Sequence, residues 1–95
     1  MLEEDPSSDF LLFAVAKEYE KIGVVSKSEE YYLRLKAYHP KYVGLYYHLA
    51  ELYKQNNKLD KAEEIYLEGI KISEELKDFH SLSELKSAYA NLFIE

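Results

Sequence analysis

The chain repeats one pattern of side chains with a period of thirty-four residues. Four positions near its middle carry large apolar or small side chains, with the later three following the first by three, four and seven residues. They are Tyr46, Leu49, Ala50 and Tyr53, and thirty-four residues earlier the same spacing holds Leu12, Val15, Ala16 and Tyr19. Such spacing puts all four side chains on one side of an α-helix. A fixed period of this length predicts that one helical unit is repeated along the chain.

A second helix follows the first within each copy of the pattern. Ala62 and Tyr66 are matched, thirty-four residues earlier, by Ser28 and Tyr32 without any gap. The polar break over residues 54–58 is too short to let the following helix run far from its predecessor. Each pair of helices is therefore expected to fold back as an antiparallel hairpin.

This pattern resembles the tetratricopeptide repeat, in which a large residue is followed by Leu, a small residue and Tyr, and the second helix carries a small residue and an aromatic one. Pro40 stands where that family closes its repeat, and Pro6 stands thirty-four residues before it. The resemblance covers about residues 7–76. It implies an all-α fold in which antiparallel helix hairpins stack as a right-handed, TPR-like α-solenoid of about five helices.

Two positions depart from the family pattern. Leu12 stands where the first large residue is usually aromatic. Leu35 stands at the position that Gly69 takes in the second copy, where the family prefers Ala. We expect the bulky Leu35 to widen the helix contact in the first hairpin.

The expected organisation is a single domain with four parts. These are an acidic lead over residues 1–8, a first repeat over 9–42, a second repeat over 43–76 and a C-terminal capping helix over 77–95. The helices are expected at about 9–22, 26–38, 42–55 and 60–76, with a fifth from 78 or 81 to about 93.

Short polar residues mark where these helices begin. Ser7, Ser8 and Asp9 can cap the first helix, and Gly23 can end it in the left-handed conformation. Capping boxes are expected at three further starts, each a polar residue followed three positions later by Glu. The pairs are Ser26 with Glu29, Asp60 with Glu63, and Ser81 with Glu84, with Asp78 as the alternative cap of the last helix. Asn56 and Asn57 are expected to tolerate the turn that Gly23 makes in the first copy.

Composition limits the class of partner. The chain is 47% apolar, which suffices for the core of one small domain, and it has no Cys. The net charge is −6, so nucleic acid and an acidic membrane surface are not expected as partners. No apolar run reaches the roughly 20 residues that span a membrane. With an acidic start instead of a basic leader, the chain is expected to be cytoplasmic.

The resemblance also implies where a ligand would bind, because the first, third and fifth helices line the inner groove in that family. Side chains one step round from the core stripe point into this groove. They are Phe10, Phe13 and Lys17 in the first helix, Tyr47, Glu51 and Lys54 in the third, and His80 and Ser83 in the fifth, with Glu20, Lys21, Gln55 and Ser87 beside them. This mixture suits a peptide or helix with an apolar anchor and a charged flank.

Alternatives remain open for the aromatic residues. Phe10 and Phe13 either pack the first helix pair or face the groove, whereas Tyr47 is the better groove candidate because Tyr46 beside it takes the core position. The carboxylate clamp of some family members is not expected, because only Lys17 has a suitable charge and the Asn partners are missing.

No catalytic, cofactor or metal site is expected. No two of the three His residues are four apart, and the chain has neither a Gly-rich phosphate loop nor a nucleophile elbow. The pairs of adjacent Glu residues, which have Lys at helical spacing, indicate solvated helix faces. The expected function is non-catalytic binding of a protein or peptide segment in the groove. The alternative is a self-associating scaffold, a possible homo-oligomer that uses the apolar face of the first helix or the Phe93–Ile94 tail.

Overall fold

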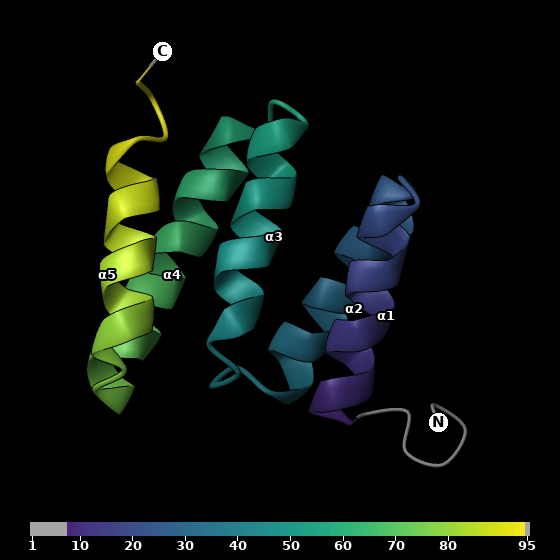
Figure 1. The fold of residues 1–95 in the computed structure, drawn as a ribbon, viewed down its shortest axis with the longest axis horizontal. Coiled ribbons are helices and arrows are strands. Elements are labelled where there is room, and N and C mark those ends of the chain that lie inside the picture. The colour runs from purple at the N-terminus through teal and green to yellow at the C-terminus, as the bar shows by residue number, and fades with distance from the viewer. Residues whose placement is uncertain (1–7, 95) are drawn as a thin grey trace. The chain divides into compact units, whose positions relative to one another are not determined.

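The computed structural model describes residues 8–94. The acidic lead lies outside the described residues except for Ser8, as does the start signal at Pro6 and Ser7. The described chain forms α1 (Asp9–Lys21), α2 (Val25–Tyr38), α3 (Gly44–Gln55), α4 (Leu59–Leu76) and α5 (Phe79–Ala90). Figure 1 shows these five helices along the chain. The expectation of an all-α fold of about five helices is confirmed.

The chain divides into two compact units, and the boundary falls after Leu45 in the first turn of α3. The first unit contains α1 and α2, which pack against each other as an antiparallel pair (Figure 1). Their shared core includes Leu12, Ala16 and Tyr32, which are fully buried. Ser28 replaces an apolar residue here, and its hydroxyl donates a hydrogen bond to the Ala16 carbonyl across the helix pair at 2.9 Å. A polar side chain is tolerated at this buried position because its hydrogen bond is made.

The second unit contains α3 from Tyr46 onward, α4 and α5. Tyr46, Leu49 and Ala50 are buried on one side of α3, and Ala62 and Tyr66 are buried on α4, as the helical spacing predicts. At Gly69, α4 approaches its neighbours closely. A Cβ added there would lie 2.6 Å from the Tyr46 Cβ and 3.1 Å from the Leu85 Cδ1. The missing side chain is therefore what lets these helices meet.

Three helix–helix turns are built in the same way. In each, one residue has a positive φ: Gly23 at 83°, Asn57 at 62° and Lys77 at 58°. The next residue then closes the earlier helix with its N–H, which bonds five residues back at 2.8–2.9 Å. This is the Schellman arrangement, which satisfies the last carbonyls of a helix. The left-handed turns expected at Gly23 and Asn57 are confirmed.

Two of the expected capping boxes are wrong. The N-cap of α2 is Val24 and that of α4 is Lys58, and neither start has a side-chain cap. Backbone hydrogen bonds explain the difference. Val24 and Lys58 each close the preceding helix with their N–H, and their carbonyl oxygens accept a hydrogen bond from the next helix. Ser28 N–H donates to Val24 O, and Ala62 N–H donates to Lys58 O, both at 3.0 Å. Each helix thus begins one residue before the expected box, and its N-cap lies two residues before it.

Side chains determine where α1 and α5 begin and where α2 ends. Ser8 Oγ accepts from Leu11 N–H, as expected for the start of α1. Asp78, not Ser81, caps α5: its carboxylate accepts both the N–H and the hydroxyl of Ser81, at 3.2 and 2.9 Å. These hydrogen bonds to the ionised form hold the Asp78 pKa below its ordinary value. His39 leaves helical geometry before Pro40, with φ −138° and ψ 67°, as expected.

The last helix is shorter than expected. It ends at Ala90 and not near Phe93, and Asn91 caps it. The amide of Asn91 donates to the Ser87 carbonyl at 3.0 Å, which satisfies a carbonyl at the helix end. Leu92 then folds back into a buried position, whereas Phe93 and Ile94 are 56% and 68% exposed.

Candidate functional site

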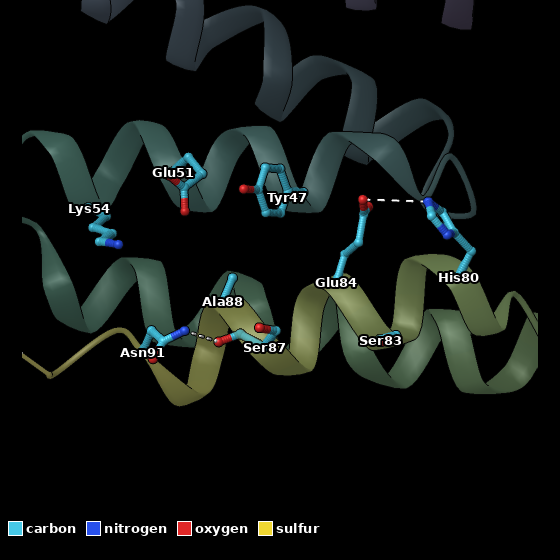
Figure 2. Close-up of a pocket in the computed structure, with 9 residues that line it drawn as sticks. All are labelled: Tyr47, Glu51, Lys54, His80, Ser83, Glu84, Ser87, Ala88 and Asn91. Atoms are coloured by element: carbon cyan, nitrogen blue, oxygen red, sulfur yellow. Dashed lines mark hydrogen bonds and ion pairs between the residues drawn. The ribbon is translucent and has the colours of Figure 1, made fainter.

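The second unit has a hollow of about 560 Å³ between α3 and α5. Side chains from both helices point into it, as Figure 2 shows. We call this hollow the α3–α5 groove, and its lining residues are Tyr47, Glu51, Lys54, His80, Ser83, Glu84, Ser87, Ala88 and Asn91. Most of these side chains are polar, so the groove is suited to recognise charged and hydrogen-bonding groups.

The two ends of the groove carry different chemistry. At one end lie Glu84 and His80, whose Oε2 and Nε2 atoms are 3.5 Å apart and form an ion pair when the imidazole is protonated. At the other end lie Lys54 from α3 and Asn91 from α5 (Figure 2). Tyr47 lies between these ends, beside the carboxylate of Glu51. The groove therefore has a carboxylate on each side of Tyr47, with Glu84 toward the start of the two helices and Glu51 toward Lys54, and it has donors near the helix ends.

The carboxylate of Glu51 is held from outside the groove. Tyr66, which is fully buried on α4, donates its hydroxyl hydrogen bond to Glu51 Oε2. Burial and this bond to a carboxylate both raise the pKa of Tyr66, so the hydroxyl stays neutral and keeps donating. The core of the second unit thus fixes the position of one charge in the groove.

The carboxylates of the groove also raise the pKa of Tyr47. Its pKa lies above the ordinary value, first because of the Glu51 charge, then because of burial and the Glu84 charge. Its side chain is 37% exposed, so the ring and hydroxyl are available from the groove. Two carboxylates on different helices therefore act on one exposed aromatic side chain.

Five of the eight predicted groove residues line this one hollow: Tyr47, Glu51 and Lys54 from α3, and His80 and Ser83 from α5. The other three, Phe10, Phe13 and Lys17, belong to the first unit and line no hollow in the second.

The two Phe residues of α1 have different surroundings. The Phe13 ring is half-buried and meets the Tyr32 ring edge-on, with 6.2 Å between ring centres, and the Tyr42 ring at 5.3 Å. Phe13 therefore packs within the first unit, which was one of the two interpretations left open. Phe10 is 70% exposed and has no part in the core.

Glu84, Ala88 and Asn91 also line the groove, but the sequence analysis did not assign them to it. Glu84 was interpreted as the partner in a helix cap. The signal was present, because His80, Glu84, Ser87 and Asn91 are separated by four, three and four residues and so share one side of a helix. Gln55, in contrast, was predicted to lie in the groove and is not among its lining residues.

Two kinds of feature are absent from the described part of the chain. Between residues 8 and 94, no group of three or more His, Cys, Asp or Glu side chains is placed to hold a metal ion. None of the helices in that part of the chain is long and apolar enough to cross a membrane.

The helices form antiparallel pairs on a 34-residue period. The groove is lined by the first helix of a pair and by the helix that follows that pair. These features define a helical-repeat protein that presents a recognition surface. The sequence model of the tetratricopeptide repeat matches residues 43–76. The chain belongs to the tetratricopeptide repeat family.

Two solved structures from Salinibacter ruber support this assignment. The solution NMR structure of a tetratricopeptide repeat domain protein is 34% identical, with 96% of this chain and 93% of that chain covered and a TM-score of 0.90. A crystal structure with the same description is 33% identical, with 90% and 96% covered and a TM-score of 0.83. No curated protein matches the chain. Tetratricopeptide repeats are in general non-catalytic modules for protein interaction, which agrees with the class expected from the sequence.

Proposed function

We propose that the chain is a non-catalytic interaction module that binds a peptide or helix segment of a partner protein in the α3–α5 groove. The observation that carries this proposal is the hollow itself, which gathers five residues predicted from the sequence onto one surface. Its centre holds an exposed Tyr, and aromatic side chains commonly contribute much of an interface's energy. The placement of Phe10 and Lys17 in the inner groove stays a prediction.

Site-specific photo-crosslinking tests this proposal in cells of the source organism. A photoreactive Phe analogue is introduced at Tyr47 in one variant and at Ser83 in another, because both residues line the groove. A control variant carries the same group at Leu67, which is exposed on α4 and does not line the groove. We expect one shared partner band at the two groove positions and none at Leu67. The same band at all three positions, or at Leu67 alone, would contradict the proposal.

Self-association remains the second candidate, because the first unit has an apolar hollow of its own. This hollow has a volume of about 390 Å³ and is lined by side chains of α1 and α2 and by Ile22, which follows α1. The lining is mostly aliphatic and aromatic: Leu11, Ala14, Val15, Glu18, Tyr19, Ile22 and Tyr31. Apolar surface of this kind is a frequent contact between copies of a chain.

Analytical ultracentrifugation over a hundredfold concentration range tests this alternative. If copies associate through the apolar hollow, Ile22→Glu returns the mass to that of a monomer, because burying a charge there is costly. Leu33→Glu introduces the same charge at an exposed position on α2 and serves as the control. A wild-type chain that stays monomeric throughout rules this candidate out.

A further inference from the structure

The charged side chains of the α3–α5 groove indicate the chemical class of its ligand. Glu51 and Glu84 come from different helices and both act on Tyr47. Neither carboxylate is fully neutralised within the groove. Glu51 accepts from a neutral hydroxyl, and the partner of Glu84 is the imidazole of His80, whose side chain is 85% exposed. Exposed pairs of this kind contribute little binding energy, so a stronger cation can displace the imidazole.

The side chains around Tyr47 have the chemistry that recognises a guanidinium or ammonium group. Charge-assisted hydrogen bonds from such a group to carboxylates are about twice as strong as neutral ones. A cation over the face of a Tyr ring gains further attraction. The hydrogen bond from Tyr66 holds the Glu51 carboxylate before any ligand arrives, which lowers the entropy lost on binding.

The opposite end of the groove offers donors. Lys54 follows Tyr47 by seven residues on α3, and Asn91 follows Glu84 by seven residues on α5. Seven residues of α-helix rise about 10 Å. Both donors thus lie about two turns further along than Tyr47 and Glu84, at the same end of the groove (Figure 2), and Glu51 lies between Tyr47 and Lys54 on α3. An extended peptide covers that distance in about three residues.

We propose that the occupant is a partner segment with an Arg or Lys side chain that lies against Tyr47 between Glu51 and Glu84. An acidic side chain about three residues away in the same segment contacts Lys54 and Asn91. This inference rests on the proposed function, because it specifies the ligand of the same groove. It assigns the groove a basic ligand residue at its centre, the opposite of an acidic peptide tail.

A random dodecapeptide display library is the probe that tests the inference. The immobilised full chain is compared with Glu84→Gln, Glu51→Gln and Tyr47→Ala. Glu51→Gln keeps an oxygen that can accept from the Tyr66 hydroxyl, so it removes the charge and not the core contact. Glu74→Gln is the matched control, because it changes the net charge equally at an exposed position on α4 outside the groove. Circular dichroism verifies that every variant is helical.

We expect wild type and Glu74→Gln to enrich peptides that carry Arg or Lys with Asp or Glu about three positions away. Each groove variant that loses a carboxylate should reduce that enrichment about tenfold, the effect of one charge-assisted contact. Lys54→Gln should remove the preference for the acidic residue while the basic one remains. These differences would support the inference.

Three other results overturn it, and they are distinguishable. Peptides without a basic residue that are enriched by wild type and lost in Tyr47→Ala would overturn the charge inference and leave the proposed groove function intact. Basic peptides enriched equally by wild type, Glu51→Gln and Glu84→Gln but lost in Tyr47→Ala would show that these carboxylates do not select the cation, and would overturn the inference alone. The absence of any enrichment that depends on Tyr47 would overturn both the inference and the proposed function.

Discussion

The two hairpins, α1–α2 and α3–α4, place the same Tyr at the same repeat position and satisfy its hydroxyl in different ways. Tyr32 of α2 donates to Glu20 Oε1 at 2.7 Å, and Tyr66 of α4 donates to Glu51 Oε2. Glu20 and Glu51 do not correspond under the 34-residue shift. In both hairpins the buried hydroxyl therefore finds a carboxylate on the facing helix, but the two carboxylates stand at different repeat positions.

The charges around these two hydroxyls are exchanged between the hairpins. Lys17 stands at the position equivalent to Glu51, and Lys54 stands at the position equivalent to Glu20. Each hairpin thus has one Lys and one Glu on the corresponding side of its first helix, in opposite order. Because Glu51 and Lys54 both line the groove, this order also decides which end of the second hairpin's surface is anionic.

The hairpins differ again where their helices approach. The second has Gly69 against the Tyr46 Cβ, whereas the first has a fully buried Leu35 at the equivalent position and Leu12 in place of Tyr46. The second hairpin thus combines a large residue with Gly, whereas the first has two Leu residues of intermediate size at the equivalent positions. In both cases the total volume stays within what a packed interface allows.

The largest expected effect comes from giving the second hairpin the residue of the first. Gly69→Leu places a branched side chain where even a Cβ would lie 2.6 Å from the Tyr46 Cβ. We expect a loss of about 3 kcal/mol in the free energy of unfolding, at the upper end of overpacking costs. Urea denaturation followed by circular dichroism measures it. Lys71→Leu adds the same side chain at an exposed position on α4 and should change stability by less than about 0.5 kcal/mol. Equal effects of the two substitutions would disprove the close contact.

Alkaline pH should distinguish the hairpins next, because Tyr46 in the second hairpin is Leu12 in the first. Burial, with the Glu68 charge, raises the pKa of Tyr46 to about 12. A folded-state pKa above the unfolded value of about 10 stabilises the fold fully below pH 10, and this stabilisation is lost as the pH rises through 12. The loss amounts to about 2–3 kcal/mol. Urea unfolding at pH 9 to 12 measures it.

Tyr46→Phe should remove that part of the alkaline sensitivity. Tyr38→Phe is the control, because Tyr38 is exposed on α2 and its ionisation costs the fold little. An unchanged slope of stability against pH in Tyr46→Phe would show that this hydroxyl is not the group responsible.

Removing either buried hydroxyl should have a smaller effect. Tyr32→Phe and Tyr66→Phe each lose one hydrogen bond to a partly exposed carboxylate, which we expect to cost about 1 kcal/mol. Thermal unfolding of the two variants beside Tyr38→Phe measures the difference. A cost in one hairpin with no cost in the other would show that the two hydrogen bonds, although chemically alike, are not energetically equivalent.

The smallest expected effect is the most discriminating. The double substitution Lys17→Glu with Glu20→Lys gives the first hairpin the charge order of the second, so the Tyr32 hydroxyl can turn to the new carboxylate. We expect its stability to stay within about 0.5 kcal/mol of wild type, whereas Glu20→Lys alone should cost about 1 kcal/mol. A double variant no more stable than the single one would mean that the hydroxyl requires one particular position.

The fold could be predicted largely because its signals are local. Helical spacing and the 34-residue period indicated five helices, and Gly23 and Asn57 indicated left-handed turns. The third left-handed residue, Lys77, was not predicted, because Lys has no preference for that conformation and only the closure of α4 places it there. The capping boxes at Ser26 and Asp60 failed for a similar reason, since backbone groups alone complete those starts.

The candidate site was predicted in part. Residues of α3 and α5 could be assigned to a groove because helical spacing decides which side chains share a face. The hydrogen bond from Tyr66 to Glu51 could not be predicted, because it depends on how α4 crosses α3 and joins residues fifteen apart. The same holds in the first hairpin, where the Tyr32 hydroxyl donates to Glu20 on the facing helix.

Gly69 finally limits how freely the second hairpin can be recombined with other repeats. Because the backbone of α4 lies directly on Tyr46, the large residue and the small one form a matched pair contributed by different helices. Exchange of whole hairpins preserves this pair, whereas exchange of single helices separates it, bringing Tyr46 against Leu35 in one combination and leaving Leu12 opposite Gly69 in the other. In the evolution or engineering of longer arrays from this chain, the hairpin and not the helix is therefore the unit that can be duplicated without redesign.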